Sequence, residues 1–395
     1  MRYTPQVSDN VYWVGVKDWK RKLFDSLIPL PKGTSYNAYL VLGGEKTVLI
    51  DTVNPGFEKL LEERIKGIIN LKHLDYVVMN HAEPDHAGAI PYVMALSGDA
   101  KLVATAKGAE MAERFYNVPR NRIIEVGGGS TLNLGDEKLE FIEAPMLHWP
   151  ETMFTYLTGD GVLFPCDFFG AHTAEGFYDA DVEDLDVQAQ RYFGGIMMPY
   201  RSMAAKALEK IKHLKIEVIA PSHGPIYRDP SRVLNKYHKW VNGETKRKVT
   251  AIYASMWGST EKMVAAMAEV LLSNGLEVVL YDLASADIGD VAKDLVDSEG
   301  LVLGVPTVLG GAHPLSVYAT YLIKVLRPPL RYAVVLGSYG WGGGAVKQIL
   351  DMMGSSKIEV LGTLEVNGPP SKEELNTIVK MGDGLSNKIL EASAL

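Results

Sequence analysis

Four residues that can bind a metal ion lie within residues 81–86: His81, Glu83, Asp85 and His86. They follow an apolar run whose β-branched and aromatic residues predict a short buried strand. In an extended or tightly turning segment, residues two apart point the same way, so His81, Glu83 and Asp85 can converge on one point. His86 then points elsewhere, which suits a second metal ion beside the first. Pro84 stiffens the turn and lowers the entropic cost of holding the ligands.

Three further strand ends carry residues of the same kind. His148 lies beyond the strand predicted for residues 138–143, and Asp167 and His223 each follow a short apolar run. A single histidine after a strand is more often a structural hydrogen-bonding residue than a ligand. Four strand ends of one kind nevertheless favour a metal centre, in which Asp167 could bridge two metal ions. The candidate ligands are His81, Glu83, Asp85, His86, His148, Asp167 and His223.

Other polar residues are candidates for supporting roles. His172, Tyr192 and Tyr200 could support a ligand or line a substrate pocket, and each could equally be a packing residue. Asp51 ends a predicted strand, where it could hold a ligand histidine from behind or cap the following helix or turn.

The elements that must position these residues form two halves. In the first, apolar runs predict strands at 11–15, 35–42, 47–51, 101–105, 122–126, 138–143 and 162–167, and helical periodicity predicts helices at 55–70 and 88–97. In the second, strands at 249–254, 277–281, 300–305, 332–336 and 360–364 alternate with helices at 261–273, 288–296, 314–326 and 344–353. This alternation predicts a doubly wound parallel sheet, whose ligands bind beyond the strand carboxyl ends. We expect domains at 1–247 and 248–395.

The second half carries a candidate phosphate-binding loop after its first strand. Its residues are Ser255, Met256, Trp257, Gly258, Ser259 and Thr260. Backbone N–H groups at a helix N-terminus bind anions, and Thr260 is a plausible N-cap. The loop contains no Lys or Arg, so a monophosphate is favoured over a nucleoside triphosphate with magnesium.

Two further loops end strands of the same predicted sheet. Glycines let the backbone approach a flat ring closely, and Tyr339 or Trp341 could stack on that ring or cover it. The alternative is that they are turn glycines and core aromatic residues. The candidate residues are Pro306, Thr307, Val308, Leu309, Gly310 and Gly311 in one loop and Ser338, Tyr339, Gly340, Trp341, Gly342 and Gly343 in the other.

Composition limits the class of protein. The 395 residues carry a net charge of −8, are 47% hydrophobic and 22% charged, and include one cysteine, Cys166. The negative charge argues against nucleic acid or an anionic membrane as a main partner. One cysteine excludes internal disulfides and any cysteine-based zinc or rubredoxin-type site within this chain. No apolar run reaches transmembrane length, and we expect a cytoplasmic enzyme.

The order and spacing of the candidate ligands resemble those of the metallo-β-lactamase fold, an αββα sandwich with a dinuclear site at one edge. Hydrolases of that superfamily have a second histidine where this chain has Glu83. Three carboxylates with four imidazoles form a harder, more anionic set than a zinc hydrolase uses. This set resembles that of flavodiiron proteins. The resemblance implies one iron held by His81, Glu83 and His148, another held by Asp85, His86 and His223, and Asp167 between them.

The second half resembles flavodoxin, an FMN-binding electron carrier, so the resemblance to flavodiiron proteins covers essentially the whole chain. It implies reduction of dioxygen to water, of nitric oxide to nitrous oxide, or both, at two irons supplied by FMN. It also implies a head-to-tail homodimer, or a dimer of dimers, and an external electron donor such as rubredoxin. One alternative is a zinc-dependent hydrolase with an appended flavodoxin module, and Glu83 argues against it. Another is an electron carrier whose metal domain is only a scaffold, but a scaffold would not require the seven ligands.

Overall fold

The computed structural model describes residues 4–354 and 356–392. The chain divides into two compact units. The first contains the residues up to Phe193 together with Tyr200–Val241, and the second contains Gly194–Pro199 together with the chain from Asn242 onward. The domain limits of 1–247 and 248–395 stay a prediction.

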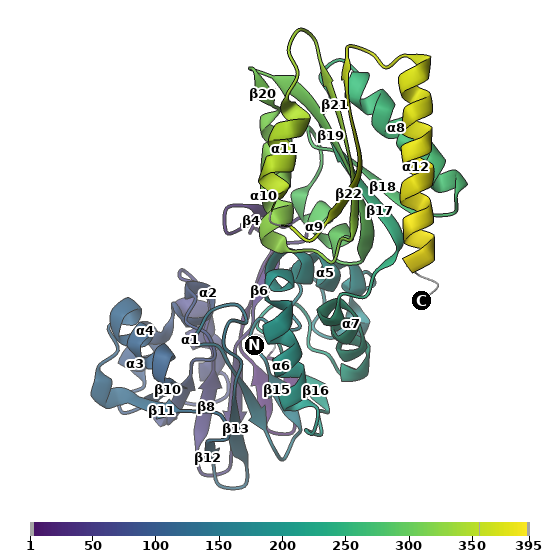
Figure 1. Cartoon of the computed structure of the whole chain (residues 1–395). Helices are drawn as coiled ribbons and strands as arrows, with labels where there is room; N and C mark the ends of the chain where they lie inside the picture. The colour runs from purple at the N-terminus through teal and green to yellow at the C-terminus, as the bar shows by residue number, and fades with distance from the viewer. Residues whose placement is uncertain (1–3, 355, 393–395) are drawn as a thin grey trace. The chain divides into compact units, whose positions relative to one another are not determined.

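The first unit contains two packed β-sheets with helices outside them, which confirms the predicted αββα sandwich (Figure 1). One sheet has the strand order β1 (Gln6–Ser8), β2 (Val11–Trp13), β7 (Tyr39–Leu42), β8 (Thr47–Ile50), β9 (Tyr76–Val78), β10 (Lys101–Thr105) and β11 (Ile123–Val126). The other has the order β12 (Thr131–Asn133), β13 (Lys138–Glu143), β14 (Met153–Leu157), β15 (Val162–Phe164) and β16 (Val218–Ile219). Buried side chains from both sheets form one core between them, including Trp13, Tyr39 and Phe164.

The single strand expected at residues 35–42 is instead two strands. β6 (Thr34–Tyr36) pairs with β3 (Val16–Asp18), and the chain then joins the large sheet as β7. The reason is Asn37, whose side-chain amide donates to the carbonyls of Pro221 and Gly224, both at 2.8 Å. A second small ribbon pairs β4 (Leu23–Phe24) with β5 (Ile28–Pro29).

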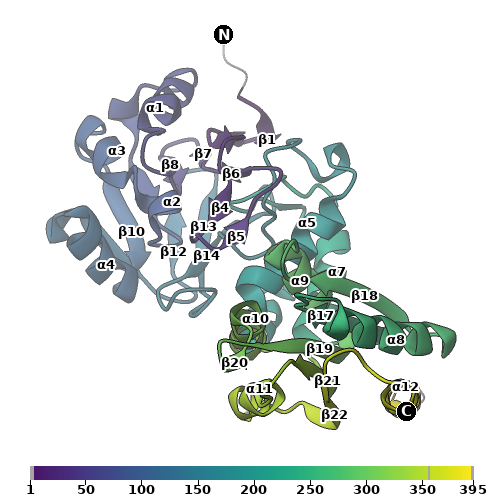
Figure 2. The same cartoon turned by 90° about the horizontal axis from the view of Figure 1, so that it is seen from above.

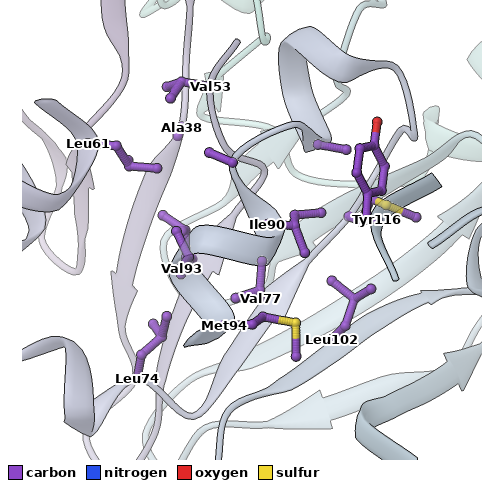
Figure 3. Close-up of a cluster of buried hydrophobic side chains, with 14 of the residues drawn as sticks. Ala38, Val53, Leu61, Leu74, Val77, Ile90, Val93, Met94, Leu102 and Tyr116 are labelled. Carbon is purple, nitrogen blue, oxygen red and sulfur yellow. The ribbon is translucent and has the colours of Figure 1, made fainter. Parts of the chain in front are cut away.

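The helices of the first unit bury apolar faces against the sheets. They are α1 (Glu58–Lys66), α2 (Pro84–Ala87), α3 (Ile90–Leu96), α4 (Ala106–Tyr116), α5 (Leu185–Tyr192), α6 (Arg201–Ile211) and α7 (Pro230–Asn242), with 3-10 turns at Leu71–His73, Arg120–Arg122 and Asp179–Asp181. Between α5 and α6, the chain forms a π-helical segment at Phe193–Met197 and a 3-10 turn at Met198–Tyr200, most of whose residues belong to the second unit. Helices α1, α3 and α4 lie along the outside of the seven-stranded sheet (Figure 2). Ile90, Val93 and Met94 of α3 pack toward Val77 and Leu102 of the strands (Figure 3).

The second unit is the predicted doubly wound parallel sheet. Its strands lie in the order β18 (Glu277–Asp282), β17 (Lys246–Tyr253), β19 (Ser298–Val308), β21 (Tyr332–Tyr339) and β22 (Glu359–Asn367), with the short β20 (Gly311–Ala312) paired to β19. Its helices are α8 (Ser259–Ser273), α9 (Ile288–Leu295), α10 (Pro314–Leu326), α11 (Ala345–Met353) and α12 (Lys372–Ala392). Figure 1 shows α8 and α12 on one face of this sheet and α10 and α11 on the other.

One buried ion-pair cluster stands out at the start of β17. Lys248 is 2% exposed, and its Nζ lies 2.8 Å from Asp294 and 2.7 Å from Asp297. Two carboxylates around one ammonium group compensate its loss of hydration. None of the helices formed by the described residues has the length and apolar composition needed to cross a bilayer.

Candidate functional site

The structure places four of the predicted ligands around one point of the first unit. Nε2 of His81 and Nε2 of His148 each lie 3.1 Å from Oε2 of Glu83 and 3.5 Å from Oδ2 of Asp167. His81 and Asp167 are fully buried, and Glu83 and His148 are nearly so. Two imidazole nitrogens and two carboxylate oxygens converging at these distances can hold one metal ion.

The other three predicted ligands form a second group beside the first. Nε2 of His86 and Nε2 of His223 lie 3.3 Å from the carboxylate of Asp85, and 3.1 and 3.3 Å from Oδ1 of Asp167. Asp167 therefore presents Oδ2 to one group and Oδ1 to the other. A carboxylate shared in this way can bridge two metal ions.

The backbone of residues 81–86 explains how neighbouring side chains serve different groups. Pro84 opens the four-residue helix α2, with Glu83 in extended conformation just before it. His81 and Glu83 therefore lie on the strand side of this junction, and Asp85 and His86 lie on a helical turn. The expectation that His81, Glu83 and Asp85 share one point is wrong for Asp85, because it assumed an extended segment throughout.

Hydrogen bonds behind the ligands orient two imidazoles. Nδ1 of His81 lies 2.7 Å from Oε1 of Glu151, and Nδ1 of His223 lies 2.6 Å from the carbonyl oxygen of Ser35. Each acceptor requires a proton on Nδ1, which leaves the Nε2 lone pair for the metal side. Glu151 is not among the residues predicted from the sequence. The signal available was a carboxylate two residues after Trp149 in the loop that carries His148.

The chemistry of the ligand set fits a dinuclear iron centre. Oδ1 of Asp85, Nε2 of His86 and Oδ2 of Asp167 are buried and make no hydrogen bond, although oppositely charged atoms lie within 3.5 Å of each. Such atoms point toward a shared position rather than at one another. Three carboxylates beside four imidazoles suit a metal that must be stabilised in its ferric state.

The protonation of these groups reflects their pairing. Burial alone would lower the pKa of His86, but the carboxylates of Asp85 and Asp167 raise it to about 10. Burial would likewise lower the pKa of His148, and Asp167 and Glu83 raise it to about 10. Burial alone would raise the pKa of Glu83. Its hydrogen bonds to His148 and His81 outweigh burial and lower this pKa to about 2. A cation bound at this position takes the place of these protons.

Asp51 supports the ligand loop without contacting a histidine by hydrogen bond. Its two carboxylate oxygens accept from the backbone N–H of Asn80, at 2.8 Å, and from the side-chain amide of Asn80, at 3.1 Å. Burial raises the pKa of Asp51 to about 6 despite the positive charge of His86. From the sequence, Asp51 was expected either to hold a ligand histidine or to cap the following helix or turn. It does neither through these contacts, which instead fix Asn80, the residue immediately before His81.

His172 and Tyr192 lie against the centre. The hydroxyl of Tyr192 donates to Oδ1 of Asp167 at 3.0 Å, and the His172 ring centroid is 4.8 Å from that of Tyr192 and 4.9 Å from that of His223. Burial and the positive charge of His223 lower the pKa of His172 well below its ordinary value. Tyr200 ends a 3-10 turn.

A cavity of about 170 Å³ opens onto the ligands. His172 and His223 line it, and Tyr200 does not. The remaining wall includes Arg21, Phe24, Asp25, Thr34, Tyr36, Glu83 and Asp85. The volume suits a molecule of a few atoms. Apart from the ligands and His172, the residues of this wall are not among those predicted from the sequence, because the β4–β5 ribbon carries no metal-type pattern.

The three predicted cofactor loops lie at one edge of the second unit. They follow β17, β19 and β21, which are adjacent and parallel. In the first loop, Oγ of Ser255 accepts from the backbone N–H groups of Gly258, at 3.2 Å, and Glu261, at 3.3 Å. Gly258 has φ of 84° and caps α8, so its lack of a side chain permits this turn. The predicted N-cap, Thr260, lies inside the helix and its hydroxyl pairs with Ser338 at 2.8 Å.

The other two segments present exposed apolar tips. Pro306, Thr307 and Val308 belong to β19, and Leu309 and Gly310 form the turn to β20 at Gly311. Leu309 is 95% exposed, and Trp257 and Trp341 are 92% exposed. Ser338 and Tyr339 end β21, and the glycines at 340, 342 and 343 continue the loop to α11. A helix N-terminus beside exposed aromatic tips and a glycine loop fits a flavin mononucleotide, with its phosphate at α8.

Comparisons with known proteins agree with both halves. A model described as ODP family beta lactamase matches residues 34–224, and a model described as flavodoxin matches residues 252–382. A nitric oxide reductase of Moorella thermoacetica is 36% identical over 394 residues, covering 98% of each chain. Rubredoxin oxygen:oxidoreductase from Desulfovibrio gigas matches with a TM-score of 0.96 and 28% identity, covering 100% of each chain. The flavodiiron protein from Giardia intestinalis matches with a TM-score of 0.94 and 28% identity, covering 99% of this chain and 98% of that one.

Proposed function

The chain belongs to the flavodiiron protein family, and from this we propose that it reduces dioxygen to water, nitric oxide to nitrous oxide, or both. It is an oxidoreductase whose cofactors are two non-haem irons and FMN. The family resemblance inferred from the sequence is confirmed. The observation that carries the proposal is the carboxylate of Asp167, which is shared between two groups of imidazole and carboxylate ligands.

The electron count matches this pair of cofactors. Reduction of dioxygen to two waters consumes four electrons and four protons, and coupling of two nitric oxide molecules to nitrous oxide and water consumes two of each. Two ferrous ions with one reduced FMN supply four electrons. The protein residues contribute binding, orientation and exclusion of water.

Each ligand has a defined role in this proposal. His81, Glu83 and His148 hold one iron, and Asp85, His86 and His223 hold the other. The contacts of Asp167 with both groups support its role as the bridge. Glu151 keeps the His81 imidazole in the metal-binding tautomer, and the Ser35 carbonyl does the same for His223. The cavity beside these ligands admits the gas.

The three loops of the second unit hold FMN in this proposal. Backbone N–H groups at the start of α8 bind its phosphate, and the segments after β19 and β21 flank its ring system. Ser255 keeps the first loop in shape through its two hydrogen bonds.

These 395 residues contain one cysteine, too few for a rubredoxin-type iron site among them, and we infer that the flavin receives its electrons from a separate donor. We propose rubredoxin as the donor, because the similar Desulfovibrio gigas protein is named for that activity. We further propose a cytoplasmic head-to-tail homodimer, or a dimer of such dimers, in which the flavin of one subunit serves the irons of the other.

Anaerobic stopped-flow spectroscopy tests the function. The purified chain is analysed for iron, zinc and flavin, reduced chemically, and mixed separately with dioxygen and with nitric oxide. We expect two irons and one FMN per chain and fast reoxidation by at least one gas. A variant at an exposed position, Glu183→Gln, serves as a control for handling. Stoichiometric zinc together with inertness to both gases would refute the reductase and favour the hydrolase.

A further inference from the structure

We propose that the hydroxyl of Thr34 sets the tautomer of His172, so that the Nε2–H group of His172 donates a hydrogen bond to the substrate in the cavity. This inference rests on the proposed function, because it concerns the same cavity and substrate. Thr34 is a positioning residue in it, and His172 is the donor that contacts the substrate.

The hydrogen bonds around Thr34 determine which way its proton points. Oγ1 of Thr34 lies 3.0 Å from Nδ1 of His172, 3.3 Å from Nδ1 of His223 and 3.4 Å from the carbonyl oxygen of Ser35. His223 cannot receive the proton, because its Nδ1 already carries one that it donates to Ser35 at 2.6 Å. The Ser35 carbonyl, which also accepts from His223, is the more distant acceptor at 3.4 Å. The threonine hydroxyl therefore donates to Nδ1 of His172.

A proton on Nε2 of His172 follows from this contact. An imidazole whose Nδ1 accepts a hydrogen bond carries its ring proton on Nε2. The Nε2 atom is buried and makes no hydrogen bond to any described residue. A buried donor without a partner is costly, so it is expected to have a function or a ligand.

The surroundings of His172 favour the substrate as that ligand. His172 is 6% exposed and lines the cavity together with the metal ligands Glu83, Asp85 and His223. Negative charge develops on the substrate oxygen as dioxygen or nitric oxide is reduced, and a preoriented N–H group stabilises it. Tyr192 is less available for this purpose, because its hydroxyl donates to Asp167 at 3.0 Å.

The first test measures the tautomer directly. The full-length wild type and the variants Thr34→Val and Thr34→Ser are labelled with 15N-histidine and loaded with zinc, which is diamagnetic. NMR then shows which ring nitrogen of His172 carries the proton in each protein. We expect the Nε2–H tautomer for His172 in the wild type and in Thr34→Ser, which keeps the hydroxyl. Thr34→Val should lose this preference. A wild-type ring protonated only at Nδ1 would overturn the proposal, and this measurement requires neither iron nor reductase activity.

The second test uses azide as a small anionic probe of the iron-loaded, oxidised protein. Hydrogen bonds to charged groups are strong enough that Thr34→Val and His172→Leu should weaken azide binding about ten-fold or more. Thr34→Ser should bind azide as the wild type does, with the same iron content in all four proteins. Azide affinity within about two-fold of wild type in Thr34→Val would contradict the donor role. Failure of the reductase itself would instead appear in the stopped-flow experiment.

Discussion

Replacing Glu151 by glutamine should weaken one of the two metal sites selectively. Glu151 is 3% exposed, and its Oε1 accepts from Nδ1 of His81 at 2.7 Å and from the N–H of Ala82 at 2.8 Å. Glutamine keeps a carbonyl oxygen for both donors, removes the negative charge and places an amide NH2 group where Oε2 was. The His81 imidazole then loses basicity at the nitrogen that faces Glu83 and Asp167.

The magnitude follows from this arrangement. Partners that hydrogen-bond a metal-binding histidine typically account for about 10- to 100-fold in metal affinity, or about 1.4–2.7 kcal/mol. The group of Asp85, His86 and His223 has no hydrogen bond to Glu151, so its affinity should change little. Oε2 of Glu151 makes no hydrogen bond. The glutamine N–H group that replaces it should therefore also lower folding stability by about 1–3 kcal/mol.

The assay is an anaerobic titration of metal-free protein with ferrous iron against a chromophoric chelator. In Glu151→Gln, one equivalent should bind about 10- to 100-fold more weakly and the other as in the wild type. Thermal unfolding of the metal-free proteins measures the stability term separately. Glu183→Gln, at an exposed position, is the matched control. Equal weakening of both equivalents, or no weakening, would refute the reasoning.

Three further predictions address the bridge, the flavin loop and the core of the second unit. Asp167→Asn should reduce the affinity for iron at both ligand groups by at least about 100-fold. The number of irons per chain after gel filtration measures this loss, and retention of two irons would contradict the bridging role of Asp167. Ser255→Ala removes an acceptor of two backbone hydrogen bonds and should weaken FMN binding about ten-fold, measured by flavin fluorescence; a dissociation constant within about two-fold of wild type would show that the loop keeps its shape without it. Lys248→Met removes the buried ammonium group between Asp294 and Asp297 and leaves them only the more exposed lysines at 293 and 246, so it should destabilise the second unit by about 3–5 kcal/mol in urea unfolding. Lys388→Met at the surface should stay within about 0.5 kcal/mol, and equal effects of the two variants would argue against the buried cluster.

Much of the candidate site was predictable because its proposed ligands follow strands. Residues such as His81 and His223 stand directly beyond apolar runs, and strand ends gather at one edge of a sheet. The same rule placed the segments after β17, β19 and β21 together. These predictions needed only local patterns and the geometry of sheets.

The remaining features depend on contacts that no local pattern reveals. Helix α2 is too short for periodicity to detect, so the local pattern did not predict the direction of Asp85, and only the family resemblance placed it with His86 and His223. Glu151 and Thr34 act through hydrogen bonds to residues far away in sequence, and their residue types are common at many positions. The break between β6 and β7 arises from the contacts of Asn37 with the loop that carries His223.

The proposed ligands of the metal centre come from both sheets of the sandwich, and this has a consequence for assembly of the protein. His81, Glu83, Asp85 and His86 follow a strand of the seven-stranded sheet, whereas His148, Asp167 and His223 follow strands of the five-stranded one. A ribosome-bound chain that ends before His223 therefore carries an incomplete centre. Because a bound ion stabilises only the state that binds it, metal insertion should come late in folding and then lock the two sheets together. Iron supply would thus govern how long the newly made protein survives proteolysis, as well as its activity.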